Sequence, residues 1–231
     1  MRVIHAKDSD EAVKLAAELF MEAADARPDA PIGLATGGTM DGIYLKLKEL
    51  GFRPKTKHAF ALDEYEGLEP GSHNSYATEL RDKFVERLGW TGTLHVPGSG
   101  HYSGETGLEL FEQRLTELGP ISAQLLGLGS NGHIAFNEPG SDFDTTTRLV
   151  ELHPATRSDN SRFFESPDLV PTHAFTQGLA TIRAATALVL IALGERKRAA
   201  LSAIFENPRP DVPLAALLDH PDLTIVSDLA F

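Results

Sequence analysis

Short apolar segments alternate with longer amphipathic segments along most of this chain. A short apolar run between turn-forming residues predicts a buried strand, and apolar residues recurring every three or four positions predict a helix. The expected strands are 32–35, 58–62, 94–96, 124–128, 187–193 and 223–226, and the expected helices are 8–27, 41–50, 74–88, 106–118 and 195–205. This alternation predicts an α/β fold, a three-layer, Rossmann-like and mostly parallel sheet with helices on both faces.

The composition narrows the classes of protein to which the sequence can belong. Of its 231 residues, 42% are hydrophobic and 23% are charged, as in ordinary globular proteins. Acidic residues outnumber basic ones by 33 to 21, which argues against nucleic-acid binding because phosphate backbones attract clustered Lys and Arg. Cysteine is absent, so disulfides and thiolate–zinc sites are excluded, and a cytoplasmic location is expected.

Neither a membrane anchor nor a second domain is expected. The longest apolar run, 184–193, is about half the length that a bilayer requires, so we expect no membrane association. The amino terminus becomes charged before the apolar core of a signal peptide could form. No internal repeat or linker divides the sequence, and residues 1–231 are therefore expected to form a single domain.

A glycine pair follows the first apolar strand, at the sheet edge where ligands bind in folds of this type. The segment Thr36-Gly37-Gly38-Thr39 lies directly between the strand at 32–35 and a helix. Its glycines allow a ligand to approach the backbone, and its hydroxyls and the free amides of a helix start suit a phosphate group. The alternative is an ordinary turn in which glycine supplies a positive φ angle.

Two acids, Asp63 and Glu64, follow the strand at 58–62. A carboxyl group partly removed from water has a raised pKa and can act as a base near neutral pH. Adjacent side chains of an extended segment point in opposite directions, so one acid is expected to face the site and the other to be structural. The alternative for either acid is a helix cap or a surface turn.

A glycine-rich loop after the strand at 124–128 carries His133, with Asn131 before it and Glu138 after it. Histidine moves protons near neutral pH, and a nearby carboxylate orients its ring and stabilises its charge. The alternative is a histidine that only hydrogen-bonds backbone groups, which is what we expect of the other histidines. No third ligand accompanies this pair, so no metal site is expected.

Two cations and a polar segment complete the expected site. Lys197 opens the helix at 195–205, where the helix dipole disfavours a cation unless an anion binds nearby. Arg162 lies in a segment rich in Ser, Asp and Asn that also carries Phe163 and Phe164. Such a segment is typical of a mobile lid with an apolar underside, which we expect around residues 152–175.

Taken together, the motifs resemble those of the glucosamine-6-phosphate deaminases. Four of them occur in the order and approximate spacing of that family: Ala-Thr-Gly-Gly-Thr (35–39), Leu-Asp-Glu-Tyr (62–65), Gly-Ser-Asn-Gly-His-Ile-Ala-Phe-Asn-Glu-Pro-Gly (129–140) and Asn-Ser-Arg-Phe-Phe (160–164). The resemblance extends from about residue 3 to 226, and the run at 133–139 is its most specific part. It implies a cofactor-independent enzyme of amino-sugar catabolism that hydrolyses glucosamine 6-phosphate to fructose 6-phosphate and ammonia.

The resemblance also implies roles for the catalytic candidates. Asp63 is similar to the base that moves the C2 proton of the sugar to C1. His133 is similar to the residue that carries the proton for ring opening, with Asn131 and Glu138 as its partners. Some family members have Asp where this chain has Asn131, so Glu138 is expected to be the main carboxylate acting on His133.

The implied phosphate site combines Gly37-Gly38-Thr39 with Arg162 and Lys197, so the expected partner is a small amino-sugar phosphate. Allosteric hexameric members carry a second basic residue where this chain has Val150, and they have a longer carboxyl-terminal tail. We therefore expect a monomer or small homo-oligomer without amino-sugar allostery of that type.

Two other functions compete with this interpretation. The 6-phosphogluconolactonases share the sheet architecture and a related glycine–histidine loop, but they follow the histidine with a Ser-Leu-Phe-Pro-like run where this chain has Phe-Asn-Glu-Pro (136–139). A non-enzymatic sugar-phosphate sensor would carry an attached helix-turn-helix and altered catalytic positions. This sequence instead retains Asp63, His133 and Glu138.

Overall fold

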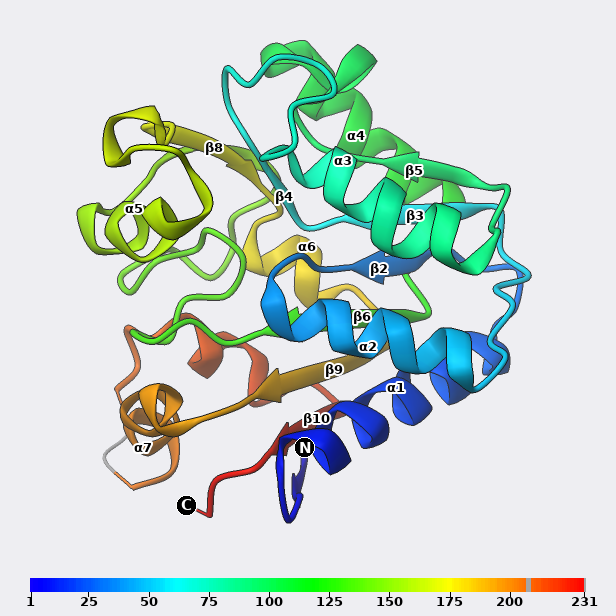
Figure 1. Ribbon diagram of the computed structural model, residues 1–231, viewed down its shortest axis with the longest axis vertical. Helices are drawn as coiled ribbons and strands as arrows, with labels where there is room; N and C mark the ends of the chain where they lie inside the picture. The colour runs from blue at the N-terminus through cyan, green and yellow to red at the C-terminus, as the bar shows by residue number, and fades with distance from the viewer. Residues whose placement is uncertain (207–208, 231) are drawn as a thin grey trace.

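A seven-stranded sheet forms the centre of the computed structural model, which describes residues 1–206 and 209–230 (Figure 1). The strand order is β1-β10-β9-β6-β2-β3-β5, and each pair of neighbours is parallel. The strands are β1 (Arg2–His5), β2 (Ile32–Leu34), β3 (His58–Ala61), β5 (Thr93–His95), β6 (Ala123–Gly127), β9 (Ala187–Ala192) and β10 (Leu223–Ser227).

Helices cover both faces of this sheet, which confirms the predicted fold class. In Figure 1, α1, α2 and α3 lie in front of the strands, and α4 and α6 lie behind them. The helices are α1 (Ser9–Ala26), α2 (Gly38–Glu49), α3 (Tyr76–Leu80), α4 (Gly104–Leu118), α5 (Pro154–Asn160), α6 (Leu179–Arg183) and α7 (Arg198–Phe205). Within the described residues, none of them is long and apolar enough to cross a membrane.

The first helix shows how local sequence positions an element on the sheet. The Asp8 carboxylate accepts the Glu11 N–H at 2.8 Å, and the Glu11 carboxylate accepts the Lys7 N–H at 2.7 Å. These bonds satisfy amides that a helix start leaves unpaired. Ala16 and Phe20 lie on the buried face of α1, which packs against β9 and β10.

A second, three-stranded antiparallel sheet was not predicted. It consists of β4 (Asp63–Tyr65), β8 (His173–Thr176) and β7 (Arg148–Glu151), in that order. These strands are three or four residues long and mix polar with apolar side chains, so they lack the apolar runs that marked the large sheet. Because β4 follows β3 after Leu62 alone, Asp63 is fixed at the junction of the two sheets.

Four helices differ from their predicted ranges by two residues or more. The helix predicted at 106–118 begins at Gly104. The helix predicted at 41–50 begins already at Gly38, because Gly37 turns the chain directly into it with a φ of 111°. The segment predicted at 74–88 is α3 continued by a π-helical stretch, Arg81–Glu86. A 3₁₀ turn, Glu195–Lys197, precedes α7, so Lys197 is the N-cap residue of that helix. The single domain at 1–231 and the lid mobility at 152–175 stay predictions.

Candidate active site

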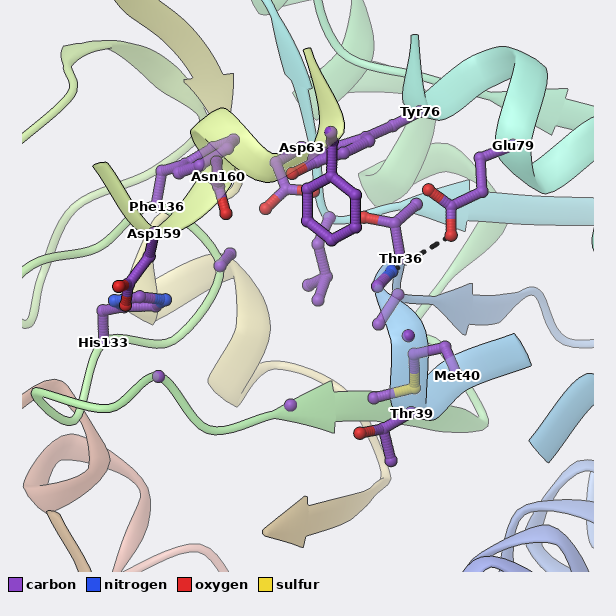
Figure 2. Close-up of a pocket in the computed structure, with 18 of the residues that line it drawn as sticks. Thr36, Thr39, Met40, Asp63, Tyr76, Glu79, His133, Phe136, Asp159 and Asn160 are labelled. Atoms are coloured by element: carbon purple, nitrogen blue, oxygen red, sulfur yellow. Dashed lines mark hydrogen bonds between the residues drawn. The ribbon is translucent and has the colours of Figure 1, made fainter. Parts of the chain in front are cut away.

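A cavity of about 540 Å³ opens at the carboxyl ends of β2, β3, β6 and β9 (Figure 2). Its size is suited to a small molecule. Of the ten residues predicted for the site, eight line this cavity: Thr36, Gly37, Gly38, Thr39, Asp63, His133, Arg162 and Lys197. The other two, Asn131 and Glu138, lie behind His133 and do not line it. Segments far apart in the sequence therefore meet at one place.

The buried carboxyl group of Asp63 faces the cavity, with 7% of the residue exposed. Burial raises its pKa well above the ordinary aspartate value, and the negative charges of Glu64 and Glu79 raise it further. No described residue donates a hydrogen bond that would stabilise its ionised form. A buried carboxylate without a donor is a strong proton acceptor once it is ionised.

Glu64, its neighbour in the chain, has a structural role. Its carboxylate accepts hydrogen bonds from the backbone N–H groups of Tyr65 (2.8 Å), Tyr76 (3.0 Å) and Ala77 (2.8 Å). It also accepts the Ser75 hydroxyl at 2.7 Å. Glu64 thus holds the start of α3, and the predicted division between one cavity-facing acid and one structural acid is confirmed.

A hydrogen-bonded chain fixes the imidazole of His133. The Asn131 Oδ1 atom accepts the His133 backbone N–H at 3.1 Å and lies 2.8 Å from its ring Nδ1. The Asn131 Nδ2 atom donates to the Glu138 carboxylate at 2.7 Å. Because this Oδ1 can only accept, Nδ1 carries the proton in the neutral ring, and Nε2 keeps its lone pair.

The sequence led us to expect that a nearby carboxylate stabilises the charged form of His133. The structure instead favours the neutral form. Burial lowers its pKa, and so does the positive charge of Lys197, whereas Glu138 and Asp159 raise it. The direct partner on Nδ1 is the neutral amide, and Glu138 lies 3.9 Å away. His133 is therefore predominantly neutral near pH 7, in the form that accepts a proton.

The loop around His133 requires its glycine at position 129. A Cβ atom there would lie 2.4 Å from the His133 ring, so the imidazole packs directly against the backbone. Ala135 has a φ of 51°, a left-handed conformation that favours glycine. The buried Asn137 side chain secures this turn by donating to the carbonyls of Ile134 (3.0 Å) and Gln177 (2.8 Å). Strain held by neighbouring bonds is typical of functional loops.

A protein carboxylate already occupies part of the predicted phosphate loop. The Gly37 N–H donates to Glu79 at 3.1 Å (Figure 2). Glu79 also pairs with Lys83 at 3.0 Å. The Gly37 amide is therefore not free for a ligand. Gly38 and Thr39 lie in the first turn of α2, where the helix leaves amides available for an anion.

The two predicted cations, Arg162 and Lys197, line the same cavity and lie close enough for their charges to interact. Burial lowers the pKa of Lys197, and the charges of Arg196 and Arg162 lower it as well, while Asp159 raises it. Mutual repulsion among these cations is relieved when an anion binds between them. Arg162 also stacks on the Phe163 ring, with its guanidinium carbon 4.7 Å from the ring centroid.

Aromatic side chains connect α5 and the segment after it to the rest of the site. Tyr65 packs against Phe136 and Phe164 with ring centroids 5.5 and 5.6 Å apart. The Asn160 Nδ2 atom donates to the Tyr65 hydroxyl at 2.8 Å. Phe164 thus forms the expected apolar underside of the segment, whereas Phe163 is 51% exposed.

Several cavity residues were not predicted, among them Tyr76, Glu79, Lys83, Asp159 and His73. His73 was interpreted as one of the structural histidines, yet it lines the cavity. Asp159 and Asn160 are adjacent to the predicted Arg162, so the lid pattern was the available signal for them. Within residues 1–206 and 209–230, no three His, Asp or Glu side chains are grouped so that they could hold a metal ion.

Comparison with known proteins places the chain in a family. The family model described as glucosamine-6-phosphate isomerases/6-phosphogluconolactonase matches residues 6–225. The chain is 36% identical over 234 residues to the glucosamine-6-phosphate deaminase of Geobacillus sp. (strain WCH70), covering 99% of this chain and 93% of that protein. The chain belongs to the glucosamine-6-phosphate deaminase family. The resemblance predicted from the motifs is thereby confirmed.

Further comparisons agree with this family assignment. The chain is 43% identical over 207 residues to the glucosamine-6-phosphate deaminase of Corynebacterium urealyticum, covering 86% of this chain and 79% of that protein. A solved structure of a monomeric glucosamine-6-phosphate deaminase superposes with a TM-score of 0.90 at 35% identity, covering 98% of this chain and 97% of that one. The 6-phosphogluconolactonase from Trypanosoma cruzi reaches 0.76 at 18% identity, covering 98% and 93%, and shares the fold.

Proposed function

We propose that this chain is a hydrolytic deaminating isomerase that converts glucosamine 6-phosphate to fructose 6-phosphate and ammonia. The observation that carries the proposal is one cavity containing a donor-free carboxyl group, Asp63, and a tautomer-fixed imidazole, His133. Two cations at the same cavity, Arg162 and Lys197, suit a phosphate group. Membership of the deaminase family supports this substrate class.

Ring opening is the first step, and His133 is the proposed proton carrier. Its Nε2 lone pair accepts the proton of the C1 hydroxyl, and the imidazolium returns a proton to the ring oxygen as the C1–O bond breaks. Asn131 fixes the tautomer, and Glu138 stabilises the charged ring through Asn131. Asn131 and Glu138 therefore act through His133 as positioning residues.

Isomerisation follows, with Asp63 as the proposed base. The ionised carboxylate removes the C2 proton of the open-chain sugar while the C1 oxygen takes up a proton from the substrate's own ammonium group, which leaves an enolamine. The protonated Asp63 then returns its proton to C1. The resulting C2 iminium adds water and releases ammonia, which leaves the ketone of fructose 6-phosphate. A positioned base of this kind contributes about 100- to 10,000-fold to the rate.

The phosphate is proposed to bind between the segment Thr36–Thr39 and the two cations, Arg162 and Lys197. The amides of Gly38 and Thr39 in the first turn of α2 and the positive charges that line the same cavity support this placement. Binding energy from a group remote from C1 and C2 orients the reacting carbons.

The same proposal includes three properties of the whole protein. We propose that it acts in the cytoplasm, as a monomer or small homo-oligomer, and that residues 152–175 open and close over the substrate. Two individual hydrogen bonds, from Asn160 to Tyr65 and from Thr156 to Glu138, attach this segment to the site, and such local attachment supports the proposed movement. Sedimentation equilibrium measures the oligomeric state, and a hexamer would contradict this part.

The experiment is a substrate comparison with the purified protein. Glucosamine 6-phosphate, galactosamine 6-phosphate and 6-phosphogluconolactone are supplied separately, and ammonia, ketose and free acid are measured. Release of ammonia with fructose 6-phosphate from glucosamine 6-phosphate is the expected result. Hydrolysis of the lactone without ammonia release would favour the lactonase alternative, and binding of sugar phosphates without turnover would favour a sensor.

A further inference from the structure

The imidazole of His133 has a neutral partner on its Nδ1 side. Asn131 contacts Nδ1 directly, and the carboxylate of Glu138 lies 3.9 Å from that nitrogen. Glu138 is shared with two other donors, since it accepts Asn131 Nδ2 at 2.7 Å and the Thr156 hydroxyl. Part of its charge is therefore engaged elsewhere. An imidazolium formed during ring opening needs additional negative charge to be stable at a buried position.

A second carboxylate, Asp159, acts on His133 from α5. Asp159 lies near the end of α5, lines the cavity, and is drawn beside the His133 ring in Figure 2. The Ser130 hydroxyl donates to its Oδ2 atom at 3.2 Å, which connects it to the loop that carries His133. Among the described residues, Nε2 of His133 has no hydrogen-bonding partner, so its cavity side is open to substrate.

We propose that Asp159 is a positioning residue of the ring-opening step, which supplies from α5 the negative charge that the neutral Asn131 does not supply to His133. The inference rests on the proposed function of His133 as the proton carrier. It divides two tasks between two residues: Asn131 selects the tautomer, and Asp159 stabilises the protonated ring.

The charges around His133 determine which of its two protonation states each neighbour favours. The charged groups that act on the ring are Glu138, Lys197 and Asp159, on three different segments. Burial and Lys197 favour the neutral ring, and the two carboxylates oppose them. Removing the charge of Asp159 therefore makes protonation of His133 less favourable.

The placement of Asp159 depends on how α5 is held. The Thr156 hydroxyl donates to Glu138, and Asn160 donates to Tyr65 at 2.8 Å, so both ends of the helix are tied to the site. Asp159 lies between these attachments. Docking of α5 thus delivers the carboxylate to His133, and undocking would remove it.

The test compares Asp159→Asn with a matched control, Asp168→Asn. Asp168 is an exposed acid of the same predicted lid and does not line the cavity. The ring resonances of His133 are followed by NMR against pH in the unliganded protein and are assigned by their absence in His133→Gln. Asp159→Asn should lower the pKa of His133 by about 0.5 unit, as expected for an exposed charge partly screened by water, and Asp168→Asn should leave it unchanged.

Steady-state kinetics provide the second readout. Asp159→Asn should lower kcat for glucosamine 6-phosphate about 3- to 10-fold, a fraction of a full acid–base contribution, without raising KM. Asp159→Glu should recover part of the loss. An unchanged pKa of His133, or a raised KM with unchanged kcat, would overturn the inference, because Asp159 would then only orient Lys197. Absence of ammonia release by the unaltered protein would instead refute the proposed function.

Discussion

The cavity has two sides of different construction. On the sheet side, Asp63 and the Thr36–Thr39 segment lie at strand ends, where ladder hydrogen bonds fix the backbone before them. His133 lies in the loop after β6, and its ring is held by Asn131. On the α5 side, residues 159–164 lie on a seven-residue helix and a 3₁₀ turn. Individual contacts to Tyr65 and Glu138 attach this side to the site.

This difference assigns separate tasks to the two sides. Proton transfer at carbon requires a base held within a fraction of an ångström, which strand ends provide. Substrate entry and the exclusion of water require a part that can move, which a short and locally attached segment provides. Substitutions on the sheet side should therefore reduce the chemical step. Substitutions on the α5 side should mainly change binding and closure, except at Asp159, which acts on the chemical step through His133.

The largest effect is expected for Asp63→Asn. Asparagine cannot accept the C2 proton, so kcat for glucosamine 6-phosphate should fall at least about 1,000-fold, near the full contribution of a positioned base. Asp82→Asn, an exposed cavity acid, serves as the matched control and should retain most activity. Turnover by Asp63→Asn within a few-fold of the unaltered enzyme would remove Asp63 from the mechanism.

A smaller loss is expected for His133→Gln, because ring opening also proceeds slowly without a catalyst. Glutamine cannot carry the proton, and kcat should fall about 100-fold. The measurement is ammonia release under saturating substrate. Raising the temperature increases the fraction of open-chain sugar, which should bring kcat of His133→Gln closer to kcat of the unaltered enzyme. If the ratio of the two kcat values did not change, the assignment of His133 to ring opening would be wrong.

On the α5 side, Arg162→Ala should act on binding. Losing one cation of the phosphate site should raise KM about 10- to 50-fold while changing kcat less than 3-fold, because the phosphate is remote from the reacting carbons. Arg183→Ala, an exposed cation of α6 that does not line the cavity, is the control. A fall in kcat with constant KM would contradict the division between the two sides.

Asp63→Asn should raise the stability of the folded protein, although it lowers its activity. Burial raises its pKa in the folded state, so the folded protein is destabilised as pH rises from the ordinary aspartate pKa of about 3.9 through the raised folded value. Asp63→Asn removes this ionisation and should raise the free energy of unfolding by about 1 kcal/mol at pH 8. Urea denaturation at pH 8 and pH 4 should show the gain disappearing at the lower pH.

The smallest effect is expected for Asn160→Ala, which removes the hydrogen bond to the Tyr65 hydroxyl. One such bond contributes about 1 kcal/mol, so α5 should open more often and kcat should fall about 2- to 5-fold. Limited proteolysis should cut residues 152–175 faster in this variant than in the unaltered protein. Equal cleavage rates would indicate that α5 is held by other contacts.

The sheet side could be predicted from the sequence, and the α5 side largely could not. The alternation of side chains in an extended segment predicted that only one of Asp63 and Glu64 faces the site, and the family resemblance indicated Asp63 as that residue. The parallel sheet followed from the apolar runs. The hydrogen bond from the Gly37 amide to Glu79 and the action of Asp159 on His133 depend on tertiary packing between segments distant in sequence. Local patterns carry no signal for such contacts, nor for the strand His173–Thr176, whose pairing with β4 sets its conformation.

Transfer of the C2 hydrogen tests the central claim most directly, namely that a strand-end carboxylate moves a proton between neighbouring carbons of the sugar. Glucosamine 6-phosphate carrying deuterium at C2 is supplied to the unaltered enzyme and to Asp63→Asn, and the label is followed by NMR. The unaltered enzyme should release the C2 deuterium, with part of it recovered at C1 of fructose 6-phosphate, and Asp63→Asn should retain it at C2. Loss of the C2 label by Asp63→Asn within tenfold of the normal rate would contradict the account.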